Sequence, residues 1–442
     1  MKKTTFHLLL SMLVAVFGFV FSANADEGNM ADKKMDKKAE AVKKDKKAEK
    51  DGWNFKGQAV LYYQTVDGWG RGSLFDQGPG ASDSGWAKAA AGLQLFAENK
   101  NLFNGIGAGF EVSGLSSLGL EEDVVFGMVQ NAGSLNDAAI TQAYLTYKHN
   151  NTSFKWGRQI LPKSLSPLAY SETYNVFRNT YEAFTVINSD IKDTTLVYSY
   201  VTKQNKSNGD MTDFYDFYDA KGGVHMFAAQ NKSYKDVTLT GSYYFVPDAI
   251  WANGGYASDA DALWLDAQFK AAKLNFGLQG GYIGGLDLPG SDDTTAFGAK
   301  VNGKIDKYKW ELAFSSTGDG TLNLANQFGA DVKTPLYTQN GLNPNALKRD
   351  SDALVARLIQ PLGKGKLIFA YTNADLGPTA LKPGAPAAGI VGGEGTYQQF
   401  DVIYKGSIDK KTKYFVAWFH QNDDRQAEDT QNFVRVWVRH FF

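Results

Sequence analysis

Side chains that could do acid–base or nucleophilic chemistry are scattered along this sequence rather than grouped. The histidines are His7, His149, His225, His420 and His440. None of them belongs to an H-E-x-x-H motif, and the sequence holds no G-x-S-x-G elbow and no phosphate-binding P-loop. Acidic pairs fall between predicted strands, where solvated charge is more usual than a glycosidase-like pair: Glu121-Glu122, Asp292-Asp293 and Asp423-Asp424. We therefore predict no catalytic residue.

Residue spacing specifies no cofactor site either. The absence of cysteine excludes disulfides, thiolate chemistry and cysteine-ligated metals. An Asp-rich loop could hold a weakly bound Ca²⁺, although no spacing identifies that loop. The net charge of -1 excludes a polycationic nucleic-acid binder, so we expect no nucleic-acid partner.

Arginines in alternating segments are the side chains that could act through charge alone. In residues 432–442, Arg435 and Arg439 share one parity, while Val434, Val436 and Val438 share the other. Because side chains alternate across a strand, a soluble sandwich would bury the valines, whereas a membrane barrel would turn them to lipid and the arginines to a wet interior. The same alternation in 353–359 predicts an inward Arg357.

The length and composition of the chain indicate which fold could hold these arginines. Its 442 residues exceed the usual domain size, and length alone would suggest several domains, with barrels as an exception. It is rich in Tyr (22), Phe (29) and Gly (46) but has only 11 Pro, which favours an aromatic-rich protein of strands and turns.

The N-terminal region has two compositions before the alternation begins. Residues 1–25 have the basic start, apolar run and Ala-Asn-Ala end of a cleaved secretory signal peptide. Residues 26–52 are rich in Lys, Ala and Asp and cannot bury a core. We interpret 26–52 as a periplasmic extension, which could be a disordered spacer, a short charged helix or an element that contacts the cell wall or a partner chain. Residues 53–442 are predicted to form one barrel.

From residue 53 onwards, period-two alternation predicts about eighteen strands. The predicted strands are 54–65, 86–98, 103–114, 138–149, 152–161, 182–188, 194–203, 223–232, 235–246, 260–271, 273–284, 294–304, 307–317, 352–361, 366–374, 396–406, 412–421 and 431–442. Short and long connections alternate, as in a transmembrane antiparallel β-barrel with tight periplasmic turns and long extracellular loops. We expect the barrel to close by antiparallel pairing of its first and last strands.

One long connection, 161–182, mixes apolar residues with charged ones and could pack on an inner wall. Its charged residues include Lys163, Glu172, Arg178 and Glu182. It is the third long connection, and folded inward it would narrow the barrel and place charges in a low-dielectric constriction.

Four short motifs around this connection occur in the order of a known family. They are Lys155-Trp156-Gly157-Arg158-Gln159, Leu161-Pro162, Tyr181-Glu182-Ala183-Phe184 and Asn188-Ser189-Asp190-Ile191. Over about forty residues the sequence resembles the OprD-type outer-membrane porins, and more closely the major outer membrane proteins of ε-proteobacteria.

The resemblance implies an 18-stranded barrel with an inward third loop, a basic pore wall, passive uptake of small hydrophilic or anionic solutes, and in this lineage a homotrimer. It makes Arg158 the first candidate for the basic wall. The alternation of side chains argues against an inward Arg158, because Arg158 shares a face with Phe154 and Trp156. It would point inward only if a bulge or the strand end resets the alternation. Glu172 and Glu182 are candidates for its acidic partner.

Two classes of function remain compatible with these observations. The first is a diffusion porin of the outer membrane, in contact with membrane lipid and lipopolysaccharide. Charges of the third loop and the wall would set its selectivity. The second is a structural or adhesive outer-membrane protein, whose loops bind external partners while the extension contacts the cell wall. An enzyme is disfavoured because no nucleophile and base occur at meaningful spacing.

Overall fold

A computed structural model describes most of the chain beyond its N-terminal region. The described residues are 52–69, 72–75, 87–121, 124–125, 127–134, 136–173, 175–205, 209–216, 222–251, 256–285, 291–326, 332–381, 393–426, 428 and 430–442. The predicted signal peptide, 1–25, and nearly all of the predicted extension, 26–52, lie outside them.

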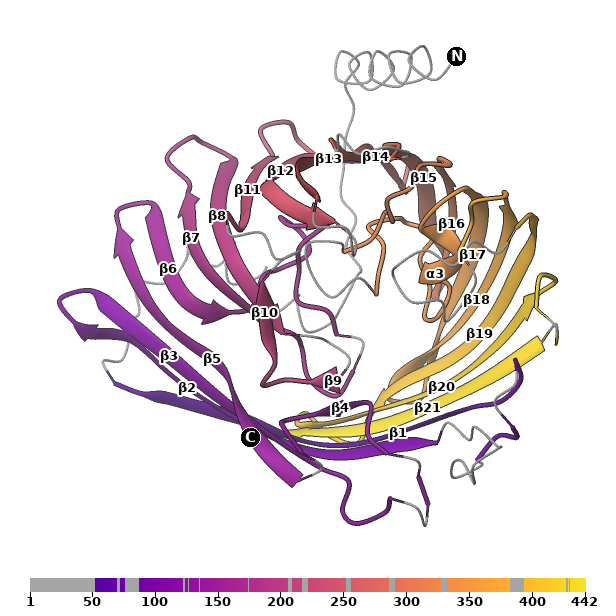
Figure 1. Cartoon of the computed structure of the whole chain (residues 1–442), viewed down its shortest axis with the longest axis horizontal. Helices are drawn as coiled ribbons and strands as arrows, with labels where there is room; N and C mark the ends of the chain where they lie inside the picture. The colour runs from indigo at the N-terminus through magenta and orange to yellow at the C-terminus, as the bar shows by residue number, and fades with distance from the viewer. Residues whose placement is uncertain are drawn as a thin grey trace.

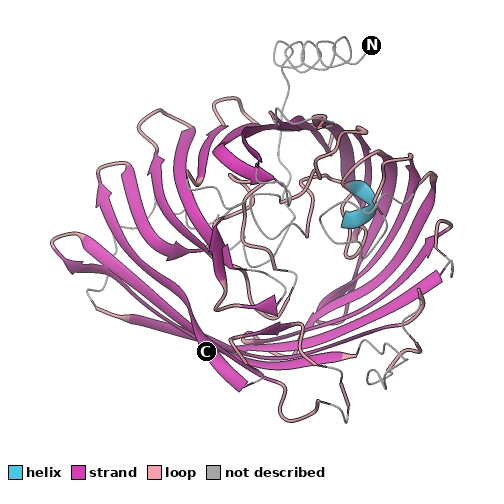
Figure 2. Ribbon diagram, in the orientation of Figure 1, coloured by secondary structure: helices cyan, strands magenta, loops and turns pink. Residues whose placement is uncertain are grey.

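The described residues form one closed antiparallel β-barrel (Figures 1 and 2). Their main sheet has nineteen strands, of which the three-residue β10 (Phe214–Asp216) lies at the rim and the other eighteen form the wall. The wall strands are β1 (Asn54–Val66), β2 (Lys88–Phe103), β3 (Ile106–Ser116), β5 (Asn136–His149), β6 (Thr152–Gln159), β7 (Tyr181–Asn188), β8 (Thr194–Asn205), β11 (Val224–Asn231), β12 (Val237–Trp251), β13 (Tyr256–Ala271), β14 (Leu274–Gly284), β15 (Thr294–Ile305), β16 (Tyr308–Thr317), β17 (Ser351–Leu362), β18 (Gly365–Leu376), β19 (Gly395–Ser407), β20 (Thr412–Asp423) and β21 (Thr430–Phe441).

The predicted closure is confirmed. β1 and β21 pair antiparallel from Gln58 opposite Phe441 to Val66 opposite Phe433. Each wall strand therefore has two neighbours, and no long edge is left to pair with another chain.

Tight turns join the strands at one end of the barrel, as the sequence predicts. Asn150 and Asp193 have positive φ angles of 50° and 55°, and Asp306 has one of 53°. Asn and Asp tolerate this left-handed region better than most residues, so they can reverse the chain within a few residues. The long connections lie at the other end and inside the barrel.

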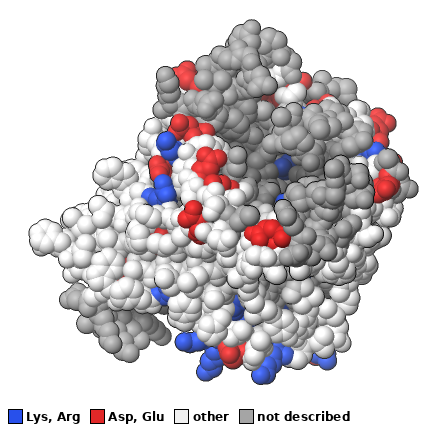
Figure 3. All heavy atoms as spheres, turned by 60° about the horizontal axis from the view of Figure 1, so that its bottom comes forward, with Lys and Arg blue, Asp and Glu red and all other residues white. Residues whose placement is uncertain are grey.

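The outer face carries a belt of large apolar side chains. On β17, Leu354 is 56% exposed and Leu358 is 41% exposed, whereas the alternating Ala353 and Val355 are buried inside. The space-filling view shows an uncharged band between regions of charged side chains (Figure 3). A soluble protein rarely exposes an apolar surface of this extent, and a membrane barrel presents it to lipid. None of the helices in the described part of the chain is long and apolar enough to span a membrane.

The hydrophobic core lies where long connections pack against the inner wall. It joins Leu168, Leu324 and Leu347 of these connections to wall residues such as Tyr244 and Ala353. Elsewhere β4 (Gln130–Asn131) pairs in parallel with β9 (Gly209–Asp210), which ties two connections together. A single turn of helix, α3 (Pro344–Leu347), lies within the ring of strands (Figure 2).

Candidate pore constriction

The first inward segment, residues 160–173 and 175–180, crosses the barrel interior between β6 and β7. The Leu168 amide donates to the Tyr244 hydroxyl at 3.2 Å on one wall. On another wall, Arg439 Nη2 donates to the carbonyl oxygens of Asn175 at 3.2 Å and Val176 at 2.7 Å. These contacts hold the segment at both sides of the interior, so it fills part of the barrel lumen.

A second inward segment, residues 318–326 and 332–350, also lies inside the barrel. The alternation of short and long connections predicts an ordinary long extracellular loop over 318–351, and the structure corrects this prediction. Its buried residues include Leu324, Leu336 and Thr338, and the Thr338 hydroxyl lies 2.5 Å from that of Ser315 on the inner face of β16. Sequence signals for this docking were weak, because its contacts are polar and distant in the chain.

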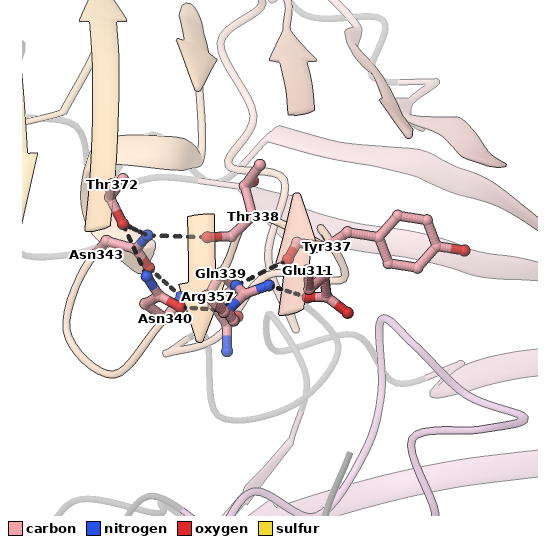
Figure 4. A network of polar contacts seen from close by, with 8 residues as sticks. All are labelled: Glu311, Tyr337, Thr338, Gln339, Asn340, Asn343, Arg357 and Thr372. Carbon is pink, nitrogen blue, oxygen red and sulfur yellow. Dashed lines mark hydrogen bonds and ion pairs between the residues drawn. The ribbon is translucent and has the colours of Figure 1, made fainter. Parts of the chain in front are cut away.

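Arg357 anchors the second inward segment to the wall, as Figure 4 shows. It projects inward from β17, as the alternation predicts. Its Nε donates to Asn340 Oδ1 at 2.8 Å, and its Nη2 donates to the Tyr337 and Gln339 carbonyl oxygens, each at 2.9 Å. Its Nη1 forms an ion pair with Glu311 on the neighbouring strand. Arg357 is therefore a docking residue as well as a wall charge.

Asparagine side chains complete the same network by bonding to the next strand. Asn340 Nδ2 donates to the Thr372 hydroxyl at 2.9 Å, and Asn343 Nδ2 donates to it at 3.2 Å. Asn343 Nδ2 also donates to the Thr338 carbonyl oxygen at 3.0 Å. The segment is thus fixed to β16, β17 and β18 together.

The two inward segments meet at Glu172. Its Oε1 accepts from Asn326 Nδ2 at 2.9 Å and from the Lys333 amide at 3.0 Å. Lys163 Nζ donates to the Thr334 carbonyl oxygen at 3.0 Å. Burial raises the pKa of the Glu172 carboxyl, and burial lowers the pKa of Lys163 to about 8. Sequence reasoning singled out both residues, and the structure brings them together at one junction.

Lysines missed by sequence reasoning project from the inner wall. Lys155 Nζ lies 3.6 Å from the ring centroid of Tyr144, and Lys300 Nζ lies 4.1 Å from that of Tyr337. Lys155 is in the same short motif as Arg158 but on the opposite parity. That parity was the signal that could have identified it as an inward residue.

Arg158 and Glu182 lie on the outer face, which corrects the expectation drawn from the resemblance. They are direct partners on β6 and β7, with Arg158 Nη2 2.8 Å from Glu182 Oε1. The pairing of β6 with β5 and β7 shows no register shift, so Arg158 stays on the face of Trp156, which is 69% exposed. Its guanidinium also stacks over Phe214 at 3.5 Å.

The remaining arginine candidates are on the inside. Arg435 is buried and its Nη2 donates to Gln64 Oε1 at 3.1 Å. Arg439 bridges Gln58 Oε1, at 3.2 Å, to the first inward segment. Arg178 belongs to that segment and interacts electrostatically with Glu111 and Arg439.

Asp423, one member of the acidic pair Asp423-Asp424, is not the solvated charge that the sequence suggests, whereas Asp424 is exposed. Asp423 is fully buried and receives Arg425 Nε at 2.8 Å and Nη2 at 2.9 Å. The same guanidinium donates to the Ala380 and Leu381 carbonyl oxygens at 3.2 and 3.0 Å, and so holds the connection after β18. Within the described ranges no group of three His, Cys, Asp or Glu side chains could hold a metal ion. A weak Ca²⁺ site stays a prediction.

Several solved structures with the same barrel are crystal structures of Pseudomonas aeruginosa proteins. OccK8 (OprE) is 14% identical with a TM-score of 0.64, over 88% of this chain and 98% of that one. The chain has the OprD-type porin fold. The same fold is found in OpdK solved with vanillate, at 12% identity and TM-score 0.64, and in OccK2 (OpdF) solved in complex with glucuronate, at 11% and 0.63. Each of these two matches covers 88% of this chain and 98% of the other.

Sequence comparison adds nothing to this likeness. No protein-family model matches the chain, and no curated protein matches it. The narrower resemblance to the major outer membrane proteins of ε-proteobacteria therefore stays a prediction.

Proposed function

We propose that the protein is an outer-membrane diffusion porin that passes small hydrophilic solutes and favours anions. The observation that carries this proposal is the junction of the two inward segments. Lys163 lies there, and Lys300 and Lys333 interact electrostatically with it. Cations placed at a narrow, low-dielectric passage concentrate anions and repel cations.

Two carboxylates, Glu172 and Asp266, also interact electrostatically with Lys163, so the three lysines outnumber them. Glu172 accepts two hydrogen bonds, and burial raises the pKa of its carboxyl. Asp266 accepts hydrogen bonds from the Tyr337 hydroxyl and from Gln268 Nε2, the latter at 2.9 Å. The ligands named in the OpdK and OccK2 structures, vanillate and glucuronate, are both carboxylates, which agrees with a preference for small organic anions.

Planar-bilayer recording tests the proposal. We expect ohmic current steps, and under a salt gradient a reversal potential that shows greater permeability to chloride than to potassium. Lys300→Gln should shift the reversal potential towards the equilibrium potential of potassium, because the substitution removes a positive charge from the lumen. Lys307→Gln is the matched control, because Lys307 is exposed in a tight turn and should leave the potential unchanged.

Folded protein that never conducts would overturn the porin proposal. A conducting channel with equal chloride and potassium permeability would overturn only the anion preference. Homotrimer assembly remains a prediction that mass measurement of the detergent-solubilised protein can test.

A further inference from the structure

Two of the long connections pack against the first inward segment. Residues 127–134, which follow β3, and residues 209–213, which follow β8, are joined by the parallel pairing of β4 and β9. The Gly209 amide also donates to the Val129 carbonyl oxygen at 3.1 Å. Figure 1 shows β4 and β9 within the ring of wall strands. We call these two stretches the cap.

The cap and the barrel wall together bury Phe177 of the first inward segment. Phe177 is 2% exposed, and it lies so close to β2 that a Cβ atom added to Gly92 would be 2.7 Å from its ring. Val129 and Met211 of the cap belong to the same buried cluster as Phe177. The absence of a side chain at Gly92 lets Phe177 approach the wall, and the cap completes its burial.

The side chain of Gln130 in the cap holds the backbone of Phe177. Gln130 Oε1 accepts from the Phe177 amide at 2.8 Å, and Gln130 Nε2 donates to the Phe177 carbonyl oxygen at 3.2 Å. A neighbouring antiparallel strand would exchange the same two kinds of hydrogen bond with this residue. Gln130 is fully buried, so the loss of either hydrogen bond would leave a buried polar group without a partner.

The second part of the cap reaches the same segment through Asn205 at the end of β8. Asn205 Oδ1 accepts from the Thr180 amide at 2.6 Å, and Asn205 Nδ2 donates to the Met211 carbonyl oxygen at 3.0 Å. The cap is therefore connected to the first inward segment at Phe177 and again at Thr180.

Arg178 lies between these two connections and carries its charge into the lumen. It is half-buried, and it interacts electrostatically with Glu111 of β3 and with Arg439 of β21. Because Gln130 fixes the backbone of the preceding residue, it also determines where the Arg178 cation lies in the passage.

We propose that the cap holds the first inward segment in its position across the barrel, and that Gln130 is the positioning residue. The inference rests on the proposed porin function, because it concerns the width and the charge of the passage. While Gln130 binds the backbone of Phe177, that ring stays on the wall and Arg178 stays at its place in the lumen. Loss of the paired hydrogen bonds releases this part of the segment, which widens the passage and displaces its charge.

Single-channel recording of the purified full chain in planar bilayers tests the inference. Gln130→Leu has a similar volume but forms neither hydrogen bond. We expect this variant to spend about tenfold more time than the wild type at a higher current level, because two buried hydrogen bonds are lost. Its reversal potential should also shift, because Arg178 moves. Ser134→Ala, at an exposed position of the cap, is the matched control and should behave like the wild type.

Gln130→Glu supplies a readout that a purely structural role would not change. A neutral carboxyl group can accept from the Phe177 amide and donate to the Phe177 carbonyl oxygen, as the carboxamide does, whereas a carboxylate can only accept. At about pH 4 this variant should record like the wild type, and at about pH 9 like Gln130→Leu, because the introduced carboxyl titrates between these values even when burial raises its pKa. Wild-type recordings at both pH values are the control.

Wild-type currents from Gln130→Leu, or currents from Gln130→Glu that follow the wild type at both pH values, overturn the inference. If Gln130→Leu does not fold, the pH dependence of Gln130→Glu decides alone. Limited proteolysis separates the inference from the porin function. A folded wild type that never conducts overturns the porin function, while faster cleavage within 175–180 in Gln130→Leu still supports the role of the cap. Equal cleavage of the two proteins overturns that role.

Discussion

Replacing Arg357 by methionine should release the second inward segment from the wall. Arg357 donates one hydrogen bond to Asn340 and one each to the backbone oxygens of Tyr337 and Gln339. Methionine keeps an unbranched apolar stem but donates none of them. The wall strand should persist, because its pairing with β16 and β18 depends on the backbone.

The expected loss of docking free energy follows from these three hydrogen bonds. Hydrogen bonds from a charged donor contribute about 1.5–3 kcal/mol each when buried, and we take about 1 kcal/mol each because the network borders a wet interior. The sum of about 3 kcal/mol shifts the equilibrium between docked and undocked segment about a hundredfold towards the undocked form, since about 1.4 kcal/mol corresponds to a factor of ten.

Single-channel recording and limited proteolysis measure the effect. The Arg357→Met channel should show a second, higher current level and more current noise, and a protease should cut within 332–350 faster. The double variant Arg357→Met with Glu311→Gln is the control for the unpaired Glu311 carboxylate, and it should behave like the single variant. Wild-type current, noise and protease resistance in Arg357→Met would show that the network does not hold the segment.

Three further predictions follow from individual contacts. Because burial lowers the pKa of Lys163 to about 8, raising the pH from about 7 to 9 removes its charge and should lower the ratio of anion to cation permeability; a Lys163→Met channel with the same pH profile would contradict this. Arg425→Ala leaves Asp423 buried without its partner and should lower the free energy of unfolding by about 3–5 kcal/mol, measured by urea unfolding in lipid; a loss below about 1 kcal/mol would refute it. Arg158→Gln should leave the reversal potential unchanged because Arg158 faces outward, and a shift would place it in the pore.

Local patterns in the sequence determined the wall of the barrel. Alternation predicts that Arg357 and Arg435 point inward. In 432–442 the valines occupy alternate positions, and this spacing predicts which face of the strand each residue takes. Turn residues such as Asn150 mark one rim. These features are predictable because a strand's side chains alternate and a tight turn depends on only a few neighbouring residues.

Only the tertiary structure decided how the interior is filled. The docking of the second inward segment depends on Arg357 and Thr372, which lie many residues away in the chain, and no local period signals such contacts. Asp423 is buried beside Arg425, and the Arg425 guanidinium also donates to the distant backbone oxygen of Leu381.

Arg158 shows how the two kinds of information combine. A short motif suggested a pore residue, whereas parity suggested the outer face. The pairing of β6 with β5 and β7 runs without a shift, although bulges occur nearby between Glu111 and Val112 and between Glu182 and Ala183. One extra residue in a strand reverses every later side chain, so the register of the neighbouring strands, and not the motif, fixed the face of Arg158.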